Sequence, residues 1–124
     1  MSRDEQRENA PILDLDVIAS LRELGGEDDP GLLLELVGLF LTDAPTYVSE
    51  IVTGFEGSDL ARVQRASHTL KSSSANMGAM GLSGLARTIE GVAKTADMEL
   101  LRELQGELQA VYQETAEALS GLQQ

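Results

Sequence analysis

Apolar residues recur at intervals of three and four along most of the chain, and this period is what most restricts the fold. Such spacing gathers apolar side chains on one face of an α-helix, whereas a half-buried strand needs alternation at every second residue. No stretch of the sequence shows the strand pattern. Leucine, alanine, glutamate and glutamine are abundant and there are only three prolines, which also favours helices. The chain is therefore predicted to be all-α.

Glycine, proline and aspartate divide this pattern into successive helices. The expected helices are 11–24, one entered at 27–30 and running to 41, one restarted at Pro45 and closed by 57, 60–77, 79–95, and a last one capped by Asp97 and running to 122. Pro45 is expected to begin a helix because proline fits a first turn and breaks an interior. Connections this short make neighbouring helices antiparallel. We expect a four-helix bundle with one or two short additional helices on its N-terminal side, after a flexible polar segment, 1–10.

Composition excludes several kinds of chemistry. The length of 124 residues suits one domain with one modest core. The chain has no cysteine and one histidine, which excludes disulfides, thiolate chemistry and multi-histidine metal sites. No tryptophan is present, and two tyrosines and two phenylalanines cannot build a platform for stacking bases. A formal net charge of -12 disfavours binding to nucleic acids and anionic membranes.

Targeting signals are also missing from the sequence. No segment reaches the roughly 18 continuous apolar residues of a membrane span, and the densest apolar stretch, 32–41, contains Glu35. Residues 1–8 are charged and lack the apolar centre of a signal peptide. A cytoplasmic location without membrane contact is expected.

The only histidine, His68, is predicted to face solvent. Its neighbours three and four positions away along a helix are all polar: Gln64, Arg65, Lys71 and Ser72. A lone exposed histidine on a helix is most often an ordinary surface residue. The residues around this one, however, are unusually small: Ala66, Ser67, Ser72, Ser73, Ser74 and Ala75. Such a bare helix surface allows another backbone to approach closely.

A carboxylate is expected opposite the histidine. If helices 60–77 and 79–95 form a hairpin turning near Ala79, His68 lies eleven positions before the turn and Glu90 eleven positions after it. A carboxylate that accepts the Nδ1–H of an imidazole leaves Nε2 as a free lone pair, which is the arrangement of an oriented nucleophile. A solvated Glu90 is the plain alternative, because the register of such a hairpin can slip by two positions.

An oriented histidine between two cations suits phosphoryl transfer. His68 could accept a phosphoryl group on Nε2, and the neighbouring ammonium of Lys71 could neutralise phosphate oxygens. The sequence contains neither a phosphate-binding G-x-x-x-x-G-K-[ST] loop nor a kinase glycine-rich loop. The phosphate is therefore expected to come from another protein and not from ATP.

The segment 66–79, Ala-Ser-His-Thr-Leu-Lys-Ser-Ser-Ser-Ala-Asn-Met-Gly-Ala, resembles a known signature. It is similar to the motif A-x-H-x-L-K-G-S-S-x-N-x-G-A of the histidine-containing phosphotransfer (HPt) domains of bacterial multistep phosphorelays. Segments 40–45 and 82–90 also resemble the corresponding helices of that family. The resemblance covers about residues 12–120 and centres on the only histidine in the chain.

The resemblance implies roles for individual residues. His68 would be phosphorylated, Lys71 would assist phosphoryl binding, and Glu90 would orient the imidazole, a position where some relatives have glutamine. Ser72 departs from the family, which usually has glycine there. Ser72 either narrows the approach to the histidine or hydrogen-bonds the phosphate, and its small size is expected to preserve function.

The expected protein is a phosphoryl carrier rather than an ATP-dependent kinase, formed by residues 11–124. His68 would carry the group between receiver-domain aspartates, from a hybrid sensor kinase to a response regulator. The chain itself would need no metal or cofactor, since Mg²⁺ is expected on the receiver, and it would be a monomer. The docking surface would include Gln64, Arg65, Lys71, Ser72 and Ala75, with Ile12, Leu13 and Ile18 as candidates for apolar contacts.

Two alternatives remain open from the residues alone. The bundle could regulate a partner by docking, without phosphoryl transfer, with His68 as one interface residue among several. It could instead be a self-associating helical scaffold, which would need exposed apolar stripes such as the last helix offers if the bundle does not bury it.

Overall fold

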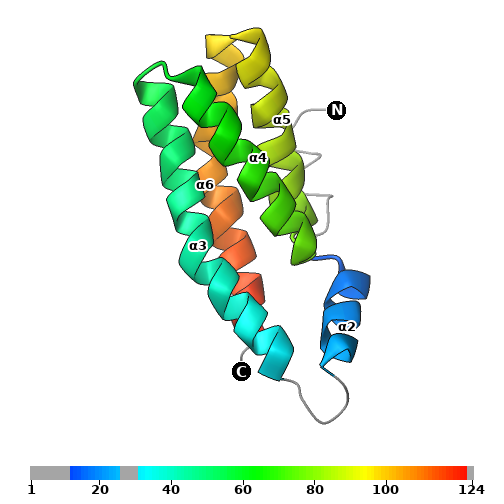
Figure 1. The fold of residues 1–124 in the computed structure, drawn as a ribbon. Helices are drawn as coiled ribbons and strands as arrows, with labels where there is room; N and C mark the ends of the chain where they lie inside the picture. Colours follow the sequence, from blue (N-terminus) through cyan, green and yellow to red (C-terminus); the bar gives the residue numbers. More distant parts are fainter. Residues whose placement is uncertain (1–11, 26–30, 123–124) are drawn as a thin grey trace.

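Five α-helices make up the structure, a computed structural model that describes residues 12–25 and 31–122 (Figure 1). They are α2 (Leu15–Leu24), α3 (Gly31–Glu56), α4 (Leu60–Asn76), α5 (Met80–Thr95) and α6 (Met98–Gly121). Within these two ranges there is no strand, so the all-α prediction is confirmed. The predicted flexible segment 1–10 and the helix entry at 27–30 lie outside the described residues.

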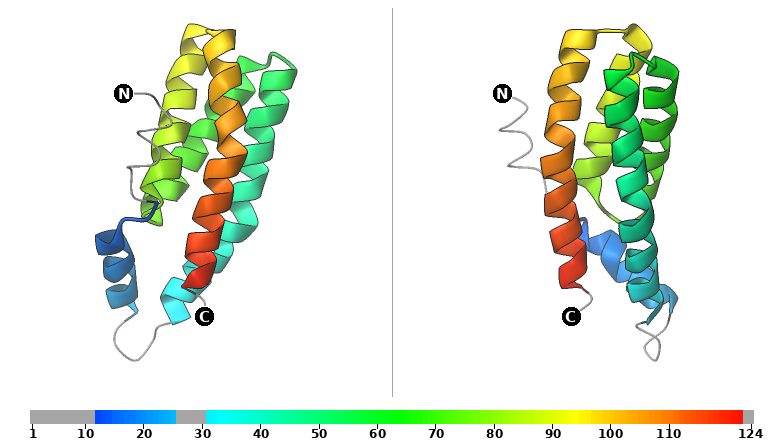
Figure 2. Two further views of the ribbon diagram at one scale, coloured as in Figure 1. Left: turned by 180° about the vertical axis from the view of Figure 1, so that it is seen from behind. Right: turned by 90° about the vertical axis from the view of Figure 1, so that its left-hand side faces the viewer.

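Helices α3 to α6 form an antiparallel four-helix bundle. Each contacts its neighbours in the chain, and α6 also contacts α3, which closes the ring (Figures 1 and 2). The helix α2 lies outside this ring, at the end where α4 meets α5, and packs against α3. The predicted architecture is therefore confirmed. It puts α4 and α5 side by side on one face, with α3 and α6 on the other.

The prediction that Pro45 begins a new helix is wrong, because α3 runs through it without a break. Proline lacks the N–H that would bond to the carbonyl of Leu41, a loss that costs about 3 kcal/mol in a helix interior. Pro45 itself is exposed, whereas Phe40, Ala44 and Val48 on either side are buried in the core. Burying a large apolar side chain stabilises by roughly 1.5–3 kcal/mol. Packing on both sides of the proline therefore outweighs the local cost.

By length and composition alone, α3 could cross a membrane. A core helix in a water-soluble bundle meets the same criterion, so this is weak evidence. In this structure, several apolar residues of α3 pack into the core of the bundle: Leu33, Val37, Phe40, Val48 and Ile51.

A glycine in the turn between α4 and α5 anchors α2. Gly78 has a φ of +73°, and its carbonyl accepts the N–H of Asp14 at 2.7 Å. A Cβ at this position would lie 3.0 Å from the Asp14 carbonyl oxygen and 3.1 Å from the Cβ of Val17. The Asp14 carboxylate caps α2 by accepting the N–H groups of Asp16 and Val17.

The apolar seam predicted for 60–77 faces the core and fixes the rotation of α4. Val63, Ser67, Leu70 and Ser74 are fully buried. The Ser67 hydroxyl donates to the Val63 carbonyl at 2.7 Å, which satisfies it inside the bundle. Because successive helical residues are about 100° apart, a buried Ser67 turns the next side chain outward.

Candidate functional site

His68 lies on the outer face of α4, as predicted, with 62% of its side chain exposed. Its ring occupies the side of α4 that faces α5, near the middle of the bundle. The Nδ1 atom is directed at α5. Because most of the side chain is exposed, a reactive group from another molecule can approach the ring.

Glu90 of α5 holds the imidazole. Its Oε2 is 2.9 Å from Nδ1 of His68, so the pairing inferred from equal distances to the Ala79 turn is present. Glu90 follows the buried Ile89 and is itself only 12% exposed, at the edge of α5 toward α4. An ionised carboxylate can only accept hydrogen bonds. In the neutral imidazole, the proton therefore lies on Nδ1 and the lone pair on Nε2.

Lys71 is bonded to the same carboxylate. Its Nζ donates to Oε1 of Glu90 at 2.8 Å, so the two carboxylate oxygens are divided between Lys71 and His68. The sequence predicted Lys71 as a partner for phosphate and did not predict this contact. A third group, Nζ of Lys94, lies 3.9 Å from Oε2. Sequence reasoning missed Lys94, although its position four residues after Glu90 on one helix was a usable signal.

These cations keep Glu90 charged. The hydrogen bond from Lys71, and secondarily that from His68, hold the pKa of the Glu90 carboxyl below its ordinary value, and desolvation by burial opposes them. At neutral pH the group is therefore a carboxylate. It remains able to accept both hydrogen bonds and to stabilise positive charge on the imidazole.

The predicted docking residues all lie on α4 but do not form one site. A shallow open depression of about 390 Å³ is lined by Gln64, Arg65, His68, Thr69 and Glu90. Ser72 is exposed and Ala75 half-buried, and neither lines the depression. They continue the surface of α4 toward its C-terminal end, where the small side chains keep it low.

The expected apolar contribution from the first helix needs one correction. Ile18 is only 3% exposed because it packs into the core, so it is not available to a partner. Ile12 is 40% exposed and Leu13 is half-buried, and both remain candidates. The structure adds Leu15 and Met80, which are exposed and were not predicted. Helical spacing identified an apolar face on α2 but did not show which part of it the bundle covers.

Fold and site together define a class of protein: a four-helix bundle that presents one solvent-exposed histidine, fixed at Nδ1 by a carboxylate. The family model for the Hpt domain matches residues 35–118, and the chain belongs to that family. It is thus a histidine phosphotransfer domain of the kind that works with receiver domains in phosphorelays.

The fold is also that of a solved relative. The crystal structure of histidine-containing phosphotransfer protein B (HptB) from Pseudomonas aeruginosa PAO1 matches with a TM-score of 0.80 and 24% sequence identity. The match covers 91% of this chain and 95% of that one. No curated protein sequence matches the chain.

Proposed function

We propose that His68 carries the phosphoryl group on Nε2. It receives the group from an aspartate of one receiver domain, in a hybrid sensor kinase, and passes it to an aspartate of another, in a response regulator. The observation that supports this most strongly is the hydrogen bond of 2.9 Å between Nδ1 and Glu90 on a ring that is otherwise exposed. In the neutral ring, that bond puts the proton on Nδ1 and the lone pair on Nε2.

The transfer needs only groups that the two proteins supply. The Nε2 lone pair attacks the phosphorus of the aspartyl phosphate in line with the leaving oxygen. A nitrogen–phosphorus bond forms, the phosphorus–oxygen bond breaks, and the aspartate leaves as a carboxylate with the electron pair. The Nδ1 proton stays in place, and Glu90 stabilises the positive charge that develops on the ring. Transfer to the second receiver is the same step in reverse.

Lys71 has a second role after the transfer. The phosphoryl group brings negative charge within one helical turn of its ammonium, which then turns from Glu90 toward the phosphate oxygens. Glu90 would lose a hydrogen bond in this exchange. Lys94, 3.9 Å from Oε2, is close enough to replace part of the lost charge.

The receiver supplies the remaining chemistry. A Mg²⁺ ion bound to the receiver would neutralise the charge on the transferring oxygens, while this chain supplies a rigid helix and an accessible nitrogen. The small side chains at Ser72 and Ala75 leave room for the partner above α4. We further propose that the domain acts as a cytoplasmic monomer.

Phosphotransfer from isolated receiver domains tests the proposal. Each receiver of the source organism is phosphorylated, mixed with this protein and Mg²⁺, and the protein is assayed for acid-labile phosphate. Wild type should gain it from at least one receiver, while His68→Gln, which keeps a polar side chain of similar size, should gain none. Wild type without phosphate across the whole panel, or equal labelling of His68→Gln, would contradict the proposal. Binding without any transfer would instead support a docking module.

A further inference from the structure

Charge is segregated between the two faces of this acidic protein. The helix α4 contains three cations and no acidic residue, and α5 contains two cations and one acid, Glu90. Five of the nine lysines and arginines, but only one of the 21 acidic residues, lie on these two helices. The helix pair that carries His68 thus has a formal charge of +4 in a chain of -12.

The opposite face has the reverse charge. The helix α3 contains four acidic residues and no cation, and α6 contains five acidic residues and one cation, Arg102. Because α3 and α6 lie side by side across the bundle from α4 and α5, the molecule has an electric dipole perpendicular to its long axis (Figure 1). In the field of a charged partner, such a dipole favours one orientation of approach.

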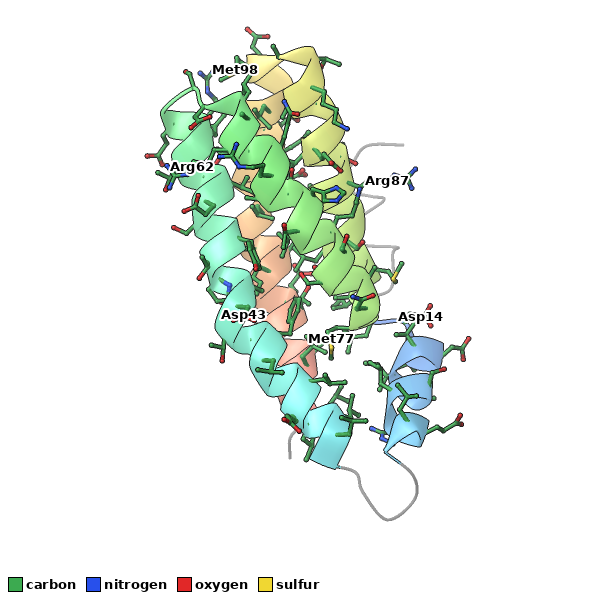
Figure 3. All side chains as sticks on the ribbon, in the orientation of Figure 1. Asp14, Asp43, Arg62, Met77, Arg87 and Met98 are labelled. Atoms are coloured by element: carbon green, nitrogen blue, oxygen red, sulfur yellow. The ribbon has the colours of Figure 1, made fainter. Side chains whose placement is uncertain are left out.

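Three of the five cations are occupied by carboxylates of the chain itself. Arg62 makes a double contact with Glu50 on α3, and its Nη2 lies 2.9 Å from Oε1 of Glu50 (Figure 3). Lys71 and Lys94 both lie at Glu90. Arg62 is thus paired with α3, and Lys71 and Lys94 share the single carboxylate of Glu90.

The other two cations, Arg65 and Arg87, make no ion pair within residues 12–25 and 31–122. Both are exposed, and Figure 3 shows Arg87 projecting outward from α5. Arg65 lies one turn before His68 on α4, and Arg87 lies one turn before Glu90 on α5. Since the helices are antiparallel, the two arginines lie on opposite sides of the His68–Glu90 pair, each about 4.5 Å along the bundle axis from it.

We propose that the α4–α5 face is an electrostatic docking surface for the acidic phosphorylation pocket of a receiver domain, and that Arg65 and Arg87 are the two side chains that recognise its negative charge. This inference rests on the proposed function. A pocket that binds Mg²⁺ beside an aspartate is built from carboxylates, so its rim is complementary to two arginines that form no ion pair in the described part of the chain. The acidic α3–α6 face repels the same pocket, which leaves the His68 side as the favoured approach.

Association rates of charge-matched variants test this surface. Stopped-flow measurements between this protein and the receiver domain that binds it most tightly are made at several ionic strengths. At low salt, Arg65→Gln and Arg87→Gln should each slow association about threefold or more, and each should flatten its dependence on ionic strength. Arg102→Gln on α6 removes the same unit of charge from the other face. This variant should keep an association rate and a dependence on ionic strength close to those of wild type.

Four results would overturn the docking surface. The first three are an equal slowing by Arg102→Gln, an association rate that does not change with salt, and the absence of association with every receiver. Equally salt-dependent binding of wild type to duplex DNA would also overturn it, because the surface would then recognise anions in general. The test is separable from the carrier function. If the two arginine variants slow association as expected while His68 takes up no phosphate, the docking surface stands and the carrier function fails.

Discussion

At the scale of single residues, the site depends on how Glu90 divides its two oxygens. One oxygen holds the Nδ1–H of His68 and the other holds the ammonium of Lys71, at 2.9 and 2.8 Å. The first contact sets which ring nitrogen is free to react. The second contact keeps the Lys71 ammonium one helical turn from His68, bonded to Glu90 and not to the lone pair of Nε2. A single carboxylate thus prepares both the nucleophile and the group that will meet the phosphate.

Replacing Glu90 separates orientation from charge. Glu90→Ala removes the acceptor for Nδ1–H and should slow phosphoryl transfer about 10- to 100-fold, by analogy with the loss when a carboxylate that orients a metal-binding histidine is removed. Glu90→Gln keeps a carbonyl oxygen that can accept the bond and should lose less. Single-turnover transfer from a saturating phosphorylated receiver measures this. Equal rates for wild type and Glu90→Ala would show that the contact has no role in the reaction.

The pH dependence of the site follows from the lowered pKa of Glu90. A carboxyl whose pKa is lower in the folded state contributes stability that is fully present above its unfolded pKa. That stability is lost as the pH falls through the lowered folded-state value. Carbon-13 NMR of the Glu90 carboxyl should therefore show a midpoint below that of the exposed glutamates. Lys71→Met should raise the midpoint, because it removes the largest cause of the shift. An unchanged midpoint in that variant would contradict the assignment.

Residue spacing predicted one of these contacts and not the other. The equal distances of His68 and Glu90 from the hairpin turn located the pair, because the register of two antiparallel helices is set by their connection. The bond from Lys71 to Glu90 depends on the rotamer of a long flexible side chain, which spacing does not determine. The burial of Ile18 was also beyond the sequence, since it depends on where α2 packs against the bundle.

At the scale of elements, tertiary packing decides where helices begin and end. Asp97 caps α6 where the sequence indicated, because a cap is a local hydrogen bond between neighbours in the chain, and Asp59 caps α4 in the same way. The prediction for Pro45 failed because it considered only local effects. A proline breaks an isolated helix, but the residues that keep α3 helical on both sides of Pro45 contact α4 and α6, which are distant in sequence.

Pro45→Ala should stabilise the protein. The substitution restores the missing helical N–H, worth roughly 3 kcal/mol, and releases up to about 1 kcal/mol of restriction on the unfolded chain. The free energy of unfolding should therefore rise by about 2 kcal/mol. Urea unfolding followed by circular dichroism measures it. A loss of stability would show that the proline ring itself contributes to packing between α3 and α6.

Gly78→Ala should destabilise the turn that anchors α2. Its φ of +73° strains any residue with a Cβ, and the added atom would press on Asp14 and Val17. A cost of about 1–3 kcal/mol is expected. Gly84→Ala is the matched control, since a Cβ added at Gly84 would have no other atom within 4 Å. In a helix interior it should stabilise by roughly 0.5–1 kcal/mol. Equal effects of the two substitutions would contradict the anchoring role of Gly78.

At the scale of the whole molecule, the fold distributes charge as well as positioning atoms. The net charge of -12 hides a positive face around the reactive histidine and a negative face behind it. The sequence showed that Lys71 and Arg65 lie near His68. Only the four-helix arrangement shows that α5 adds positive charge to the same face and that the negative charge of α3 and α6 lies on the opposite face. Repulsion between chains that each carry a net charge of -12 also favours the monomer, which sedimentation velocity checks at several protein concentrations. A dimer at micromolar concentration would contradict that expectation.

The position of the phosphoryl group on the imidazole tests the central claim most directly. Wild-type protein is phosphorylated by a receiver domain, and the linkage is assigned by phosphorus-31 and nitrogen-15 NMR. Because Glu90 holds the Nδ1 proton, the account predicts a single phosphohistidine at residue 68 with phosphorus bonded to Nε2. Phosphorus on Nδ1, or on any residue other than His68, would contradict it.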